Sequence, residues 1–144
     1  MAMWIRKNDN YYEIRVKVFT YENGSLGIDL CNKATGLPVF TVTNDFCRLD
    51  NPGCCLLNDC IAWTVADVVE FLYDNDIAIF AGCKVVSNTE RAYVFRCNLA
   101  QLMEFDPVGT SEYLKIKGLT KKDVNLLTKA YIDKMENLRN LARL

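Results

Sequence analysis

The sequence predicts an α+β protein in which a three-stranded meander and a second hairpin form an antiparallel sheet. One central helix packs on this sheet, and a long amphipathic helix ends the chain. Three observations predict this class: alternating apolar residues around an Asn-Gly turn, a central run with helical periodicity, and a C-terminal segment without Gly or Pro. At 144 residues the chain is long enough to bury a substantial core without disulfides.

The first hairpin follows from segment 11–21, which alternates apolar and polar residues before Asn23-Gly24 and strand 25–31. A two-residue loop would place the apolar rows of the two strands on opposite faces. A three-residue loop over 22–24 places them on one face, so it is the register that we predict. It pairs Thr20 with Leu26, Val18 with Ile28 and Val16 with Leu30. Residues 37–43 complete the meander.

The central helix is predicted over residues 65–74. Residues 44–59, which precede it, show no clear period and contain the turn Asn51-Pro52-Gly53, so they are predicted to form a loop. Thr64 with Asp67 resembles a capping box, and Trp63 with Val68 has the spacing of a hydrophobic staple.

A second hairpin is predicted from strands 77–86 and 92–97. Asn98 then caps a short helix that has Gln101 at its third position, and residues 106–109, Asp-Pro-Val-Gly, are predicted to close it. A short linker containing Gly118 follows.

The last helix is predicted to begin at Thr120, with Asp123 three residues later. Its apolar stripe consists of Val124, Leu127, Tyr131, Met135, Leu138 and Ala142. We therefore divide the chain into an α+β core domain, residues 1–112, and a C-terminal helical extension, residues 113–144, packed on the core or at an interface. The core carries 9 basic and 15 acidic residues, and the extension carries 8 basic and 3 acidic residues. Such an asymmetry is typical of a partner-binding segment or of a solvated helix face.

The seven cysteines do not follow a metal-binding pattern. There is no His and no Cys-x2-Cys pair, so we expect no metal and no cofactor. An odd number of cysteines fits a cytoplasmic protein whose thiols are reduced and packed in the core. The alternative is that the turn at 51–53 leaves Cys54 or Cys55 exposed and reactive.

Catalytic motifs are also missing. Without His the chain lacks the usual general base near neutral pH, and it contains no nucleophile elbow, P-loop or dinucleotide fingerprint. We therefore expect a protein that is not an enzyme. No signal-peptide pattern is present, and the longest apolar run, residues 77–83, is too short to span a membrane.

The order of the segments resembles a family of uncharacterised proteins. A meander ends in FTVTN, NDCIAWTVADVVEFLYDNDIAI follows, and a hairpin ends in AYVFRCNLAQLMEFDP. This resembles a small family, a domain of unknown function, carried on conjugative elements and phages of gut bacteria. The likeness covers residues 12–107, and Val94 stands where members tend to have Pro. The resemblance implies a mobile-element protein and supplies no catalytic residues. It rests on Asn44, Trp63, Phe71, Leu72, Tyr93 and Phe95.

Three functions remain open. The first is a protein-binding module, accessory or inhibitor-like, that binds another protein or a second copy of itself through the last helix. Its interface would contain Lys121, Lys122, Lys129, Tyr131, Met135, Leu138 and Arg139. The alternative for this stripe is simple packing on the sheet. The second function is nucleic-acid binding by the basic helix, which the acidic core would oppose. The third is a thiol-dependent role of Cys54, Cys55 or Cys60.

Overall fold

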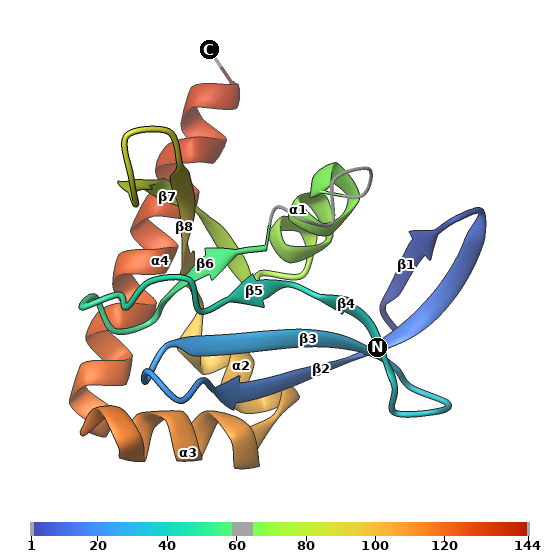
Figure 1. The fold of residues 1–144 in the computed structure, drawn as a ribbon, viewed down its shortest axis with the longest axis horizontal. Helices are drawn as coiled ribbons and strands as arrows, with labels where there is room; N and C mark the ends of the chain where they lie inside the picture. The colour runs from blue at the N-terminus through green and yellow to red at the C-terminus, as the bar shows by residue number, and fades with distance from the viewer. Residues whose placement is uncertain (1, 59–64, 144) are drawn as a thin grey trace.

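The computed structural model describes residues 2–58 and 65–143, and its eight strands and four helices are shown in Figure 1. The strands are β1 (Trp4–Lys7), β2 (Asn10–Thr20), β3 (Leu26–Asn32), β4 (Pro38–Thr41), β5 (Thr43–Asn44), β6 (Cys54–Leu57), β7 (Ala78–Val85) and β8 (Arg91–Cys97). The helices are α1 (Val65–Asp74), α2 (Leu99–Phe105), α3 (Pro107–Lys117) and α4 (Lys121–Ala142).

The α+β class is confirmed, but the strands form two antiparallel sheets. The first has the order β1-β2-β3-β4 and the second the order β5-β6-β8-β7. The predicted meander is present as β2, β3 and β4, and the predicted second hairpin as β7 and β8. Strands β1, β5 and β6 were not predicted. In particular, the supposed loop after Asn44 contains β6, which pairs with β8.

The register predicted for the first hairpin is confirmed. Val18 is paired with Ile28 and Thr20 with Leu26. The Tyr21 N–H donates to the Ser25 carbonyl at 2.8 Å, and Gly24 has a φ of 86°, which closes the three-residue loop. The apolar rows of both strands therefore face one core.

The first sheet curls so that its two outer strands approach each other. Lys7 Nζ, from β1, donates to the Val39 carbonyl of β4 at 2.7 Å. The next outward carbonyl of β4, that of Thr41, accepts from Asn58 Nδ2 at 3.1 Å. The outer edge of β4 therefore has its backbone acceptors satisfied by side chains, a common protection of edge strands.

The main core lies between the inner face of the first sheet, one face of the second sheet, and helices α1 and α2. Its largest fully buried apolar side chains include Leu26, Ile28, Leu30, Leu72, Ile77, Leu99 and Leu102. Helix α1 has the predicted bounds, although its predicted cap, Thr64, and staple residue, Trp63, lie outside the described residues. Helix α2 is capped as predicted, since Asn98 Oδ1 accepts from the Gln101 N–H at 3.2 Å.

Residues 106–109 do not end the helical region; they begin a new helix, α3. Asp106 caps it and Pro107 occupies its first turn, where the fixed φ of proline suits a helix and its missing N–H is no loss. The predicted boundary between residues 112 and 113 falls inside α3. Tyr113 is buried in the main core, and its hydroxyl accepts from the Gly53 N–H at 3.0 Å.

Helix α4 begins with the predicted capping box. Thr120 Oγ1 accepts from the Asp123 N–H, and Asp123 Oδ2 accepts from the Thr120 N–H. The helix runs along the second sheet (Figure 1), where Tyr131 and Met135 form a small buried cluster with Ile79 of β7. The alternative in which the stripe packs on the sheet therefore describes this part of α4.

Candidate functional site

The packing of α4 on the second sheet buries some residues of the predicted interface and leaves the others at the surface. Tyr131 and Met135 are buried within the chain, so they do not offer a surface to a partner, and the prediction for these two residues was wrong. The physical reason is that the second sheet presents Ile79 on the face opposite the main core, and the apolar stripe of α4 covers it. Burial is also the main reason that the pKa of the Tyr131 hydroxyl is raised.

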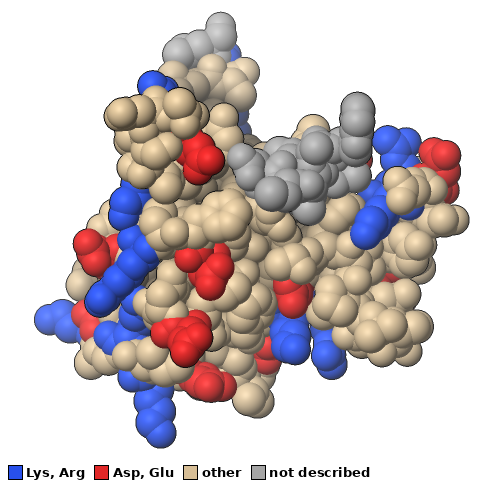
Figure 2. All heavy atoms as spheres, viewed as in Figure 1, with Lys and Arg blue, Asp and Glu red and all other residues tan. Residues whose placement is uncertain are grey.

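The other members of that predicted interface lie at the surface. Lys121, Lys122 and Lys129 are exposed, Leu138 is at the border of exposure, and Arg139 Nη2 lies 3.6 Å from Asp76 Oδ1. Figure 2 shows that Lys and Arg side chains along the α3 and α4 side of the molecule are interspersed with Asp and Glu. This mixture of charges is typical of a solvated helix face.

The cysteines of β6 are not exposed. Cys54 and Cys55 are both buried, because strand β6 lies inside the second sheet with one cysteine on each face. Burial raises the pKa of the Cys54 thiol, which lowers the fraction of thiolate at neutral pH. The alternative of a reactive pair at this turn is therefore corrected: both residues pack as small apolar side chains. Cys60 lies outside the described residues.

The thiol of Cys55 on β6 lies close to the thiol of Cys97 on the neighbouring strand β8. Cys55 Sγ is 3.5 Å from Cys97 Sγ, and neither cysteine is in a disulfide. This hydrogen bond, together with burial, raises the pKa of Cys97 well above its ordinary value. Among residues 2–58 and 65–143, no group of three or more Cys, Asp or Glu side chains is arranged to hold a metal ion. None of the described helices combines the length and apolar character needed to cross a membrane.

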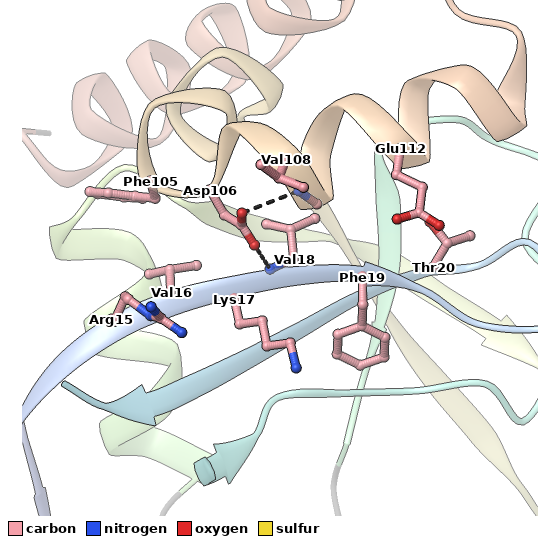
Figure 3. A pocket seen from close by; sticks show the side chains of 11 residues that line it. Arg15, Val16, Lys17, Val18, Phe19, Thr20, Phe105, Asp106, Val108 and Glu112 are labelled. Atoms are coloured by element: carbon pink, nitrogen blue, oxygen red, sulfur yellow. Dashed lines mark hydrogen bonds between the residues drawn. The ribbon is translucent and has the colours of Figure 1, made fainter. Parts of the chain in front are cut away.

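A groove of about 460 Å³ lies between the edge of β2 and the start of α3 (Figure 3). Asp106 crosses it: Oδ2 accepts from the Val18 N–H at 2.9 Å and Oδ1 accepts from the Gly109 N–H at 3.1 Å. The same carboxylate thus caps α3 and satisfies a backbone donor on the edge of β2. We assign this groove a structural role.

A more accessible apolar surface lies along the β7–β8 hairpin. Phe80 and Tyr93, with ring centroids 6.3 Å apart, are 48% and 44% exposed. Phe80 also contacts buried Phe95, with ring centroids 5.9 Å apart. The exposed aromatic pair is therefore in direct contact with the core.

A hollow of about 650 Å³ borders Tyr93. Phe46, which is 68% exposed, also lines it, as do Val86 and Leu57. Asn44, Asn88, Thr89 and Glu90 supply most of its polar lining. We call Phe46, Phe80, Val86 and Tyr93, together with this hollow, the hairpin patch. Aromatic and aliphatic side chains surrounded by polar ones are the composition found at the centres of protein interfaces.

One strand of the hairpin patch extends past its neighbour. The pairing of β6 with β8 ends at Leu56 and Val94, whereas β8 continues to Arg91. Residues 91–93 of β8 line the hollow. The sequence predicts a hairpin here, but it does not reveal the patch, because residues 44–59 show no periodic signal for β6. The alternation of Arg91, Tyr93 and Phe95 on one face was the available signal.

The comparisons with known proteins leave the family open. No protein-family model matches the sequence, and no curated protein or solved structure is similar to it at a significant level.

Proposed function

We propose that this protein is a non-enzymatic binding protein whose partner is another protein, contacted through the hairpin patch. The observation that carries the proposal is the exposed aromatic pair Phe80 and Tyr93 beside a hollow lined by Phe46. Large aromatic side chains exposed together represent apolar area that a partner can remove from water. The family resemblance noted above supports an accessory or inhibitor-like role on a mobile element.

The occupant that fits best is an extended segment of the partner with apolar side chains. Such a segment can lie beside residues 91–93 of β8, where β6 no longer pairs, and add a strand to the second sheet. Its alternate side chains would then enter the hollow between Phe46 and Tyr93. Glu90 and Arg91 at the rim offer one charge of each sign, which favours a partner segment of low net charge.

Panning of a phage-displayed peptide library on the immobilised protein tests this mode of binding. We expect peptides with alternating apolar residues that bind the wild type and lose binding to Tyr93→Asp and Phe46→Asp. Tyr11→Asp is a matched control, because Tyr11 is 67% exposed and lies on the first sheet. Far-UV circular dichroism of each variant checks that it is folded.

The result that contradicts the proposal is a set of peptides that bind Tyr93→Asp and Phe46→Asp as well as the wild type, or no enrichment at all. Sedimentation of the wild type and of Tyr93→Asp distinguishes the remaining occupant, a second copy of the chain. A dimer that dissociates in Tyr93→Asp would replace the extended partner segment by self-association.

A further inference from the structure

A second surface lies on the outer face of the first sheet, far along the chain from the hairpin patch. The pairing of β1 with β2 places Trp4 opposite Glu13 and Arg6 opposite Tyr11. Because side chains alternate along a strand, these four residues share one face, and the intervening Ile5 points to the core. Trp4 is 56% exposed and Tyr11 67% exposed. The hairpin projects from one side of the molecule (Figure 1), so both rings are accessible.

Basic side chains continue along the same face. Arg15 and Lys17 follow Tyr11 and Glu13 on alternate positions of β2, and both are exposed. In Figure 3 they project from the side of β2 opposite α3. Successive side chains on one face of a strand are about 6.8 Å apart, so these cations form a row rather than a cluster.

The charges on this face are predominantly positive. Lys33 Nζ lies 3.3 Å from Glu13 Oε1, which neutralises the carboxylate. Among the described residues, no carboxylate oxygen lies within 4.0 Å of the charged groups of Arg6, Arg15 or Lys17. Asp29 lies opposite Lys17 in the pairing of β2 with β3 and attracts it, so this carboxylate offsets part of the positive charge. In the described part of the chain, three cations therefore remain outside ion pairs, although the chain as a whole has a net charge of −1.

A shallow hollow of about 460 Å³ joins the two rings to the polar part of this face. Trp4, Tyr11, Glu13, Asn32 and Lys33 line it. A flat ligand group can lie against the rings there, with hydrogen-bonding groups of Asn32 and Lys33 at its edge.

We propose that this face, called the β1–β2 face, binds single-stranded nucleic acid. The exposed rings of Trp4 and Tyr11 provide stacking surfaces for unpaired bases, and Arg6, Arg15 and Lys17 attract the phosphates. Paired bases are already stacked on one another and cannot use the rings, which disfavours a duplex. An acidic peptide would satisfy the cations but not both aromatic rings. The inference goes beyond the proposed protein partner, because it concerns a different surface and a different ligand.

Fluorescence anisotropy of labelled oligothymidylate and oligouridylate tests the proposal. With three available cations, the affinity for a single strand should fall with a slope of about −2 on logarithmic salt axes, or about 20-fold between about 50 and about 200 mM salt. Trp4→Ala and Tyr11→Ala should each weaken binding at least about fivefold. In Arg15→Gln/Lys17→Gln the salt slope should become shallower by about 0.7 for each residue replaced.

Matched controls come from surfaces already described. Phe46→Ala removes an equally exposed ring, and Lys122→Gln/Lys129→Gln removes two exposed cations from α4; neither should change affinity. Equal loss in the α4 variant would locate binding on the basic helix and overturn the assignment of this face. Binding that is unchanged in Trp4→Ala/Tyr11→Ala, when circular dichroism shows a folded variant, would also overturn it. Anionic phosphatidylserine vesicles are a further arm: binding to vesicles without binding to oligonucleotides would replace the proposal by a membrane contact.

Discussion

Replacement of Asp106 tests the junction where β2, α2 and α3 meet. In Asp106→Ala, α3 loses its N-cap acceptor, which costs about 1 kcal/mol. The Val18 N–H on β2 also loses a charged acceptor. Hydrogen bonds to charged groups contribute about 1.5 to 3 kcal/mol, and the lower value applies because this one is only partly buried. The free energy of unfolding should therefore fall by about 2.5 kcal/mol, a substantial fraction of a typical total of about 5–15 kcal/mol.

This loss converts into a measurable change in melting temperature. A chain of 144 residues has an unfolding entropy of about 0.3 kcal/mol/K, so Asp106→Ala should melt about 8 °C below the wild type. Urea unfolding followed by far-UV circular dichroism gives the free energy directly. Asp106→Asn separates the two contributions, because Asn caps helices as well as Asp does. It should lose only the Val18 bond, about 1.5 kcal/mol.

The control is Glu104→Ala, an exposed position on the neighbouring helix α2, which should change stability by no more than about 0.5 kcal/mol. The reasoning is refuted if Asp106→Ala is as stable as Glu104→Ala. It is also refuted if Asp106→Asn is as destabilised as Asp106→Ala, since the cap and the strand bond would then not be separable.

Three further predictions follow from buried groups. Gly109→Ala should destabilise the protein by more than about 1 kcal/mol, because an added Cβ would overlap the Val18 carbonyl; urea unfolding measures this change. Burial raises the pKa of Tyr113 to about 12, whereas tyrosine in an unfolded chain ionises near about 10. The folded state therefore holds this proton more tightly, so stability from this group is complete below about pH 10 and is lost as the pH rises toward about 12. Tyr113→Phe should be less stable at neutral pH, because the Gly53 N–H loses its acceptor, and should lose less stability over that alkaline range than the wild type does. Finally, a thiol reagent at neutral pH should modify exposed Cys83 much faster than buried Cys54 and Cys97, and equal rates measured by mass spectrometry would contradict the burial.

Local signals were sufficient for several elements of this fold. The register of the first hairpin was predictable because only one loop length puts both apolar rows on one face. The starts of α2 and α4 were predictable because Asn98 and Thr120 are N-cap residues. The side chain of each accepts a hydrogen bond from the backbone N–H three residues later. These signals depend on residues close in sequence.

The missed elements depend on distant partners or on ambiguous residues. Strand β6 has four consecutive buried residues, which show no alternation because both faces of the sheet are covered there. Pro107 and Gly109 look like helix breakers, but Pro107 starts α3 and Gly109 allows α3 to approach Val18. Strand β1 has only four residues, and its signal was the Asn8-Asp9 turn, where both residues have positive φ.

The candidate surfaces could not be predicted from residue types alone. Tyr131 and Met135 are residue types that are common at interfaces. An apolar stripe on a helix does not by itself show whether the surface that covers it belongs to the same chain or to another protein. The hairpin patch required knowledge of where β6 stops beside β8. The β1–β2 face required β1 itself, since only its pairing places Trp4 and Arg6 beside the alternating cations of β2.

The contact between Asp106 and Val18 also affects how the chain emerges during synthesis. The two residues are 88 positions apart, and translation adds about 5–20 residues per second. A nascent chain therefore spends about 4 to 18 seconds with this edge of β2 available to other chains before its own carboxylate can reach it. The meander can form within that interval, because its turns are local. Its protection against pairing with a neighbouring nascent chain comes only with the second half of the sequence.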